Sequence, residues 1–197
     1  MATIADDADR YSHSRYSKVA ITLHWLIALM IIGNVIGALI FEGLLDSPDA
    51  AERARGVLIV NIHKSIGLTV LVLSLMRLAW RVRHGFPRLP EHMARWEIAL
   101  ARGNHLVFYF LMIAVPFAGY IMSSSGRYPI IYFGLFEVPK LPVGKGLGDF
   151  AHEAHGILAF TTVGLLVLHV AGALKHHFLD RDDVLARMLP LVRPKRP

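Results

Sequence analysis

The chain has 197 residues, of which 54% are hydrophobic and only 18% are charged, whereas an average globular domain carries about 25% charged residues. It has eleven histidines but no cysteine, which excludes disulfides, thiolate metal sites, cysteine-held iron–sulfur clusters and thioether-attached haem. The net charge of +6 comes without interleaved aromatic residues or a nucleic-acid-binding module, so we expect no nucleic acid among its partners.

Four segments are long and apolar enough to cross a bilayer, which takes about 20 helical residues. They are residues 19–41, 57–80, 105–122 and 156–174. None alternates apolar and polar residues as the strands of a membrane β-barrel do. The sequence therefore predicts an all-α integral membrane four-helix bundle. Its domain spans residues 19–178, between an N-terminal tail of residues 1–18 and a basic C-terminal tail of residues 179–197.

Three connectors separate these segments. Residues 42–56 form a short acidic loop, and residues 81–102 form a basic connector for which we expect a short interfacial helix around residues 91–100. Residues 123–154 form the longest loop, rich in glycine, proline and aromatic residues. Loops of this length are usually functional or disordered, and the aromatic content favours an ordered cap at the membrane surface.

The distribution of positive charge predicts the orientation. Fifteen of the 21 Lys and Arg residues lie before the first segment, between Arg77 and Arg102, or from Lys175 onward, and five lie in the first and third loops. Because cytoplasmic loops of membrane proteins carry the excess of Lys and Arg, both termini are expected in the cytoplasm. The excess of Lys and Arg residues is therefore explained by the orientation of the chain in the membrane.

Histidines occur within or beside every segment, where ionisable side chains are costly and usually functional. His155 and His169 are 14 residues apart, so they share one helix face and lie about 21 Å apart along its axis. By depth, His24 is level with His169 near the inner end, and His63 is level with His155 near the outer end. Two pairs of facing histidines at two depths are what two stacked haems with histidine on both sides require. Iron with a histidine ligand on both sides has no open coordination position, which favours electron transfer over oxygen chemistry on the metal.

Other residues bear on the same sites. Gly67, one turn from His63, leaves room for a flat macrocycle or for close helix packing. Arg77 shares the His63 face at the depth of the inner pair, where it could neutralise haem propionates or extend to the headgroups. His105, at the inner end of the third segment, could compete with His24 as a ligand or serve a quinone or proton pathway.

Several stretches resemble the prokaryotic cytochrome b561 family. They are Ile21–Leu26, Asn61–Gly67, Asn104–Leu106 with Tyr109, Leu168–Phe178 and Asp180–Leu185, in order along nearly the whole chain. The resemblance implies a four-helix bundle that holds two non-covalent haems b, ligated by His24 with His169 and by His63 with His155. The fourth-helix signature is split between His152 and His155, so His152 remains an alternative ligand.

The resemblance also implies a function. Members of the family carry single electrons between a quinone, such as ubiquinone, and a second redox partner, and some resemble superoxide:quinone oxidoreductases. Lys64, beside the outer site, could attract superoxide or a quinone carbonyl, or extend to the headgroups. We therefore expect a dihaem cytochrome of the bacterial inner membrane that contacts lipid, a quinone and a periplasmic redox partner. The alternative is the haem-bearing membrane anchor of a larger dehydrogenase.

Overall fold

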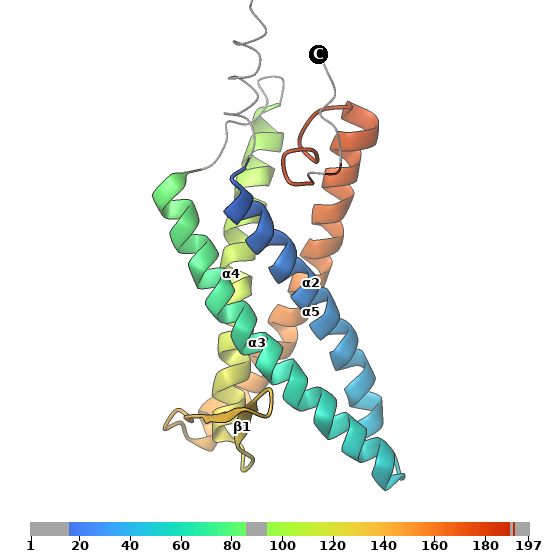
Figure 1. Cartoon of the computed structure of the whole chain (residues 1–197), viewed down its shortest axis with the longest axis vertical. Helices are drawn as coiled ribbons and strands as arrows, with labels where there is room; N and C mark the ends of the chain where they lie inside the picture. The colour runs from blue at the N-terminus through green and yellow to red at the C-terminus, as the bar shows by residue number, and fades with distance from the viewer. Residues whose placement is uncertain (1–15, 86–93, 190, 192–197) are drawn as a thin grey trace, which may run out of the picture.

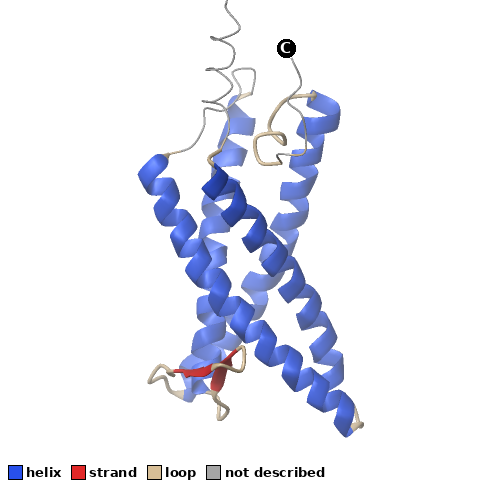
Figure 2. Cartoon of the chain, in the orientation of Figure 1, coloured by secondary structure: helices blue, strands red, loops and turns tan. Residues whose placement is uncertain are grey.

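The computed structural model describes residues 16–85, 94–189 and 191, and four long helices dominate it (Figure 1). The helices are α2 (Lys18–Leu45), α3 (Ala50–His84), α4 (Arg95–Ser125) and α5 (Lys145–Lys175), and α5 continues into one turn of π-helix, η1 (His176–Asp180). Two short strands, β1 (Ile130–Tyr132) and β2 (Phe136–Val138), form a hairpin between α4 and α5. Elsewhere the described chain is helix or short loop (Figure 2).

All four helices are long and apolar enough to span a membrane, which confirms the predicted four-helix bundle. Two connectors differ from the prediction. Helix α4 already begins at Arg95, so residues 95–100 form its first turns instead of a separate interfacial helix, while residues 91–93 lie outside the described residues. Helix α5 begins at Lys145, which makes the long loop shorter than predicted. Residues 1–15, 190 and 192–197 of the predicted tails also lie outside the described residues.

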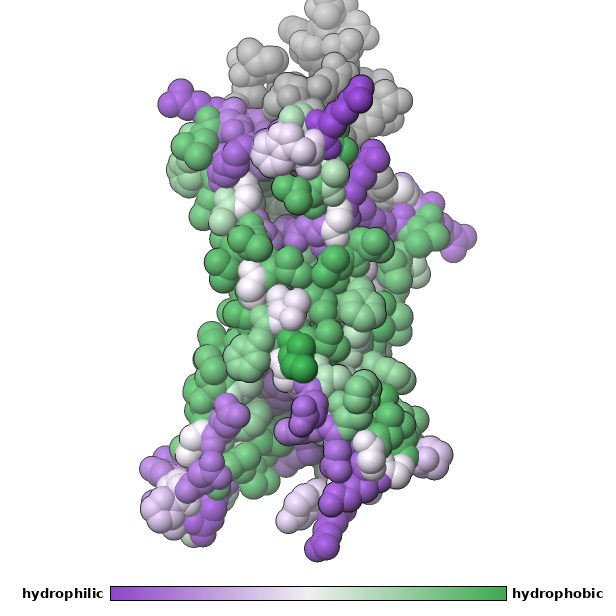
Figure 3. Space-filling model, turned by 180° about the vertical axis from the view of Figure 1, so that it is seen from behind, coloured by the Kyte–Doolittle hydropathy of each residue, from purple (hydrophilic) through white to green (hydrophobic). Residues whose placement is uncertain are grey.

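The helices associate as two pairs. Helix α2 packs on α3 and α4 packs on α5, and contacts between α3 and α4 join the pairs. Figure 1 shows the first pair crossing in front of the second. The buried apolar core is small and centres on Ile27, Val70 and Met112. Most other large apolar side chains point outward, and on the face seen in Figure 3 they form a band between two polar ends, as expected for a surface in contact with lipid.

The two ends of the bundle differ. The end at which α2 begins and α5 finishes, called the terminal end below, also carries residues 181–189, the C-terminal segment. The indole N–H of Trp25 donates to the carbonyl of Met188 at 2.7 Å, which holds this segment against α2. Lys175 bridges Glu97 at 3.1 Å and Asp180 at 2.7 Å, and so joins the start of α4 to the finish of α5.

The opposite end, called the hairpin end, is shaped by a tight turn. The hairpin loop is residues 133–135, because Tyr132 pairs with Phe136. Its first two residues, Phe133 and Gly134, have positive φ, 48° and 77°, as the central residues of a type I′ turn do. The left-handed conformation is unfavourable for Phe133 by about 1–2 kcal/mol. Its N–H donates to the hydroxyl of the buried Ser65 on α3 at 2.9 Å, and Thr69 and Tyr132 share a hydroxyl hydrogen bond of 2.9 Å. The expected ordered cap is therefore a hairpin fastened to α3.

Candidate functional site

At the terminal end three half-buried histidines from three helices meet. The ring centres of His24 on α2 and His169 on α5 are 6.2 Å apart, with an interplanar angle of 67°. His105 on α4 also faces His169, with 6.5 Å between ring centres. Helices α2 and α5 are not one of the extensively packed pairs, so these rings face each other across the space between the two helix pairs.

A second pair of rings lies toward the hairpin end. His63 on α3 and His155 on α5 have ring centres 6.1 Å apart and an interplanar angle of 72°. Phe41 of α2 packs edge-on against His63 at 5.4 Å. The exposed His152 lies elsewhere, with its Nδ1 3.0 Å from the sulfur of Met122. Helical phase alone favoured His155 over His152, and the structure places His155 opposite His63.

The spacing of both pairs fits a metal ion between the rings. A ligating imidazole nitrogen lies about 2.0–2.1 Å from its metal and about 1.1 Å from its own ring centre, so two rings on opposite sides of one ion have centres about 6.3 Å apart. A direct hydrogen bond between two imidazoles would bring the centres to about 5 Å. The observed 6.2 Å and 6.1 Å match the first geometry and exceed the second.

The second nitrogen of each hairpin-end ring meets a backbone carbonyl. Nδ1 of His63 is 3.2 Å from the carbonyl oxygen of Asn34, and Nδ1 of His155 is 2.9 Å from that of Val115. A carbonyl oxygen can only accept, so each Nδ1 carries the hydrogen and each Nε2 presents a lone pair. This arrangement is typical of metal-ligating histidines, whose other nitrogen is held by a carbonyl or carboxylate.

The terminal-end rings have different partners. A guanidinium nitrogen of Arg77 lies 3.0 Å from Nδ1 of His24, and the side-chain amide of Asn104 lies 3.3 Å from Nδ1 of His169. The sequence predicts Arg77 at the depth of the inner pair, and in the structure its guanidinium contacts the ring of His24.

Positive charge gathers around these rings. The guanidinium carbons of Arg77 and Arg81 lie 5.8 Å and 5.3 Å from the ring centre of Tyr109, within the range of cation–π attraction. Tyr16, just before α2, lies in the same field. Burial raises the pKa of its phenol, while Arg81 and Arg77 act in the opposite direction. The terminal end of the bundle is thus a positively charged, aromatic environment.

Glycine residues allow the rings and helices to approach. A Cβ atom on Gly119 of α4 would lie 3.1 Å from two atoms of the His155 ring, which is closer than an ordinary van der Waals contact. A Cβ atom on Gly67 would meet only the Asn34 amide, at 4.0 Å. Gly119 therefore lets α4 support His155, and the gap predicted at Gly67 faces α2.

Four of these residues were not predicted as part of the site, and only one left a signal in the sequence. Asn104 directly precedes His105 in a stretch that resembles the family. Gly119 and the carbonyls of Asn34 and Val115 could not be found, because neither a backbone acceptor nor the contact of a helical glycine is visible in residue types. Lys64, which was predicted, lies within electrostatic reach of Lys140 of the hairpin connector.

The chemistry of the donor set fits haem. The histidines of both pairs come from helices that leave an interhelical space between them. At the hairpin end both Nε2 atoms present lone pairs, whereas Nδ1 of His24 accepts from Arg77 and must give up that hydrogen bond for its Nε2 to bind a metal. Neutral imidazoles are common haem ligands, and helix bundles build cofactor sites from facing side chains of this kind.

Comparisons with known proteins agree with this geometry. The sequence model described as prokaryotic cytochrome b561 matches residues 15–191. The chain is 36% identical over 177 residues to cytochrome b561 homolog 2 of Escherichia coli K12, covering 89% of this chain and 91% of that protein. It is 29% identical over 181 residues to the probable superoxide oxidase CybB of Yersinia pestis, covering 92% and 99%. It is 27% identical to cytochrome b562 of Cereibacter sphaeroides, covering 88% and 94%. The chain therefore belongs to the prokaryotic cytochrome b561 family of membrane proteins, which bind b-type haem and transport electrons.

Proposed function

We propose that the chain is a dihaem cytochrome that carries single electrons across the bacterial inner membrane between a quinone, such as ubiquinone, and a second redox partner. The spacing of the two ring pairs, 6.2 Å and 6.1 Å between centres, carries the proposal. His24 with His169 would hold one haem b, and His63 with His155 the other. Bound haem supplies one-electron chemistry, because its iron alternates between the ferric and ferrous states.

The residues of the chain set the conditions for this chemistry. Histidine on both faces leaves no open coordination position, so the two sites suit electron transfer rather than ligand binding on the metal. His155 and His169 are about 21 Å apart along α5, which supports two sites toward opposite faces of the membrane. The carbonyl acceptors of Asn34 and Val115 fix the orientation of the hairpin-end rings.

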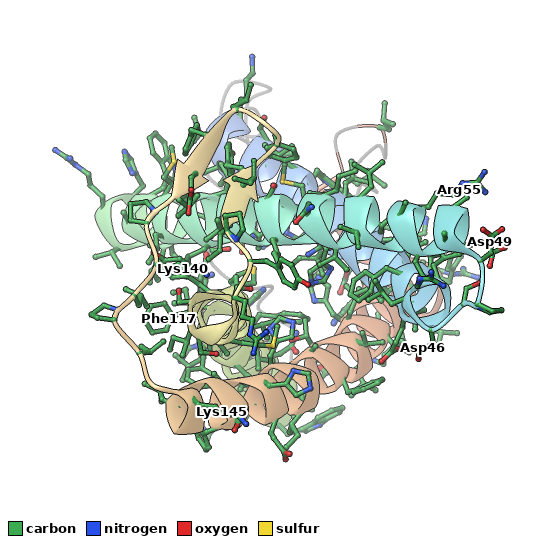
Figure 4. All side chains as sticks on the ribbon, turned by 90° about the horizontal axis from the view of Figure 1, so that it is seen from below. Asp46, Asp49, Arg55, Phe117, Lys140 and Lys145 are labelled. Atoms are coloured by element: carbon green, nitrogen blue, oxygen red, sulfur yellow. The ribbon has the colours of Figure 1, made fainter. Side chains whose placement is uncertain are left out.

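The hairpin end suits a partner outside the cytoplasm. With the termini in the cytoplasm, as the distribution of positive charge favours, this end faces the periplasm. Viewed from this end, Lys140 and Lys145 lie on the side away from Asp46 and Asp49 (Figure 4). Together with Lys64 they give the side near the hairpin a positive charge that attracts anions. Superoxide is an anionic one-electron donor of this kind, and one relative is named a probable superoxide oxidase.

His105 is proposed to act near the terminal-end site without ligating iron. Its ring centre is 6.5 Å from that of His169, while His24 lies closer at 6.2 Å, so His24 and His169 would hold the haem and His105 would remain beside it. At the positively charged terminal end, His105 and Arg77 would line the path for a quinone and its protons. Arg77 could also contact a haem propionate.

The pyridine haemochrome assay on the purified chain tests the proposal, with two haems b per chain as the expected result. His24→Ala and His63→Ala are each expected to lose one haem, while His105→Ala keeps both. Finding no haem would refute the proposal, and full haem in His24→Ala would move the ligand to His105. Reduction of the purified protein by superoxide and its oxidation by ubiquinone distinguish this function from that of a membrane anchor, which would react only with a co-purified subunit.

A further inference from the structure

Three arginine side chains, called the arginine cluster below, meet at the terminal end of the bundle. Arg77 and Arg81, one turn apart on α3, hold their guanidinium carbons 5.8 Å and 5.3 Å from the ring centre of Tyr109 on α4. Arg187 of the C-terminal segment acts, together with these two arginines, on the phenol of Tyr16 just before α2. All five side chains are half-buried. Four parts of the chain that are far apart in sequence therefore place three cations around two phenols.

Two indole hydrogen bonds hold the parts of this cluster together. The indole N–H of Trp25 on α2 donates to the carbonyl of Met188, the residue after Arg187, at 2.7 Å. The indole N–H of Trp80 on α3 donates to the hydroxyl of Ser17 at 3.1 Å, which ties the start of α2 to α3. Indole rings are enriched where a membrane meets water, so we expect the arginine cluster at the level of the lipid head groups.

The negative groups nearby must be weighed against these cations. The described carboxylates of this end are those of Glu97, Asp180, Asp182 and Asp183. The first two bridge Lys175, at 3.1 Å and 2.7 Å. Asp182 lies 2.7 Å from Nδ1 of His176. Asp183, four residues before Arg187, sets one negative charge against three positive ones. The arginine cluster is therefore electropositive.

The donors of this cluster suit an oxyanion of the phosphate type. A guanidinium presents its N–H groups in a planar fork that matches the geometry of a phosphate. Burial raises the pKa of the Tyr16 phenol above its usual value, so the hydroxyl keeps its hydrogen at neutral pH and can also donate. Two guanidinium groups against the ring of Tyr109 repel each other, and an anion beside them would offset this repulsion. Basic pockets between membrane helices bind the head groups of anionic lipids in this way.

We propose that Arg81 and Arg187, with the hydroxyl of Tyr16, form a binding site for the head-group phosphate of an anionic phospholipid. Arg77 has another role, because its guanidinium donates to Nδ1 of the half-buried His24 at 3.0 Å and so points into the bundle. The large apolar side chains exposed on α2 and α3 provide the surface on which the acyl chains would lie. The site depends neither on haem nor on which face of the membrane the terminal end occupies.

The test is a lipid titration of the purified full chain, followed by native mass spectrometry. Phosphatidylglycerol is the anionic probe and phosphatidylcholine, which carries no net charge, is the comparison. The unaltered chain should bind one phosphatidylglycerol in preference to phosphatidylcholine. Arg81→Gln and Arg187→Gln should each weaken this binding about fivefold, the contribution of one arginine near a membrane surface. Arg83→Gln is the matched control, because it removes the same charge from an exposed position on α3 and should leave the affinity unchanged.

Two results would overturn the proposal directly. Equal affinities for the two lipids, or equal losses in Arg81→Gln and Arg83→Gln, would show that the attraction is diffuse and that no built site exists. Circular dichroism of each variant checks that its helices are retained, so that a loss of binding is not a loss of fold.

A further arm separates the lipid phosphate from the carboxylates that haem carries. The titration is repeated on the haem-depleted chain, on the chain loaded with haem, and on the chain loaded with haem dimethyl ester, which has no free carboxylate. Equal affinity for phosphatidylglycerol in all three supports the lipid site. Competition by haem but not by its ester would assign Arg81 and Arg187 to the haem carboxylates and overturn the proposal.

Discussion

Replacing Gly119 with alanine tests whether α4 supports a metal-ligating ring. The added Cβ would lie 3.1 Å from Cε1 and Nδ1 of His155, a few tenths of an ångström inside ordinary contact. The backbone of α4 is fixed by its own hydrogen bonds, so the ring must move away. That movement lengthens the 2.9 Å hydrogen bond between Nδ1 and the carbonyl of Val115. Such a bond contributes about 1 kcal/mol, and its weakening should lower the haem affinity of this site about fivefold.

The assay is a stepwise haem titration of the purified, haem-depleted protein, with the Soret absorbance as the readout. Gly119→Ala should weaken one of two binding steps and leave the other unchanged. Gly103→Ala is the matched control, because it lies on the same helix and its Cβ would have no atom within 4 Å. Both substitutions raise helix propensity by about 1 kcal/mol, so the pair separates stability from support of the ring. Equal haem affinities in the two variants would refute the reasoning.

Three further predictions concern contacts beyond the rings. Asn104→Leu removes the polar partner of the α5 histidine at the terminal end and should weaken haem binding there about tenfold, measured in the same titration, with Asn104→Gln as a partial rescue. Ser65→Ala leaves the N–H of Phe133 without its acceptor and should lower the free energy of unfolding by about 1–3 kcal/mol in a denaturant titration. An unchanged midpoint would contradict the role of Ser65 in holding the hairpin against α3. Trp25→Phe removes the hydrogen bond to the C-terminal segment, and amide exchange in residues 184–189 should speed up about fivefold.

The sequence predicted the parts of the fold that depend on composition along the chain. Hydropathy located four spans, and helical phase chose His155 over His152, because both properties follow directly from residue type and spacing. The starts of α4 and α5 were predicted too late in the chain, because these helices begin at Arg95 and Lys145, outside the apolar segments. A hydropathy pattern detects apolar segments, so it does not reveal the polar first turns of these two helices.

Other features depend on which surfaces meet. The hairpin has strands of three residues each, too short for a pattern of alternation to be recognised. The carbonyl acceptors of His63 and His155 belong to the backbone, so residue type does not reveal them. To predict the contact between Arg77 and His24, one would need to know the relative positions of α2 and α3. The spacing of residues along a helix indicates the depth of Arg77, but the residue that it contacts depends on how the helices pack.

Both ring pairs draw one histidine from α5, the fourth long helix along the described chain. Neither pair is complete while the first three helices alone are in the membrane, although α2 and α3 can already pack together. The indole of Trp25, next to His24, donates to the carbonyl of Met188, which also follows α5 along the chain. Neither site can therefore be completed before α5 has been synthesised and inserted, and a chain that stops before α5 would lack both ring pairs.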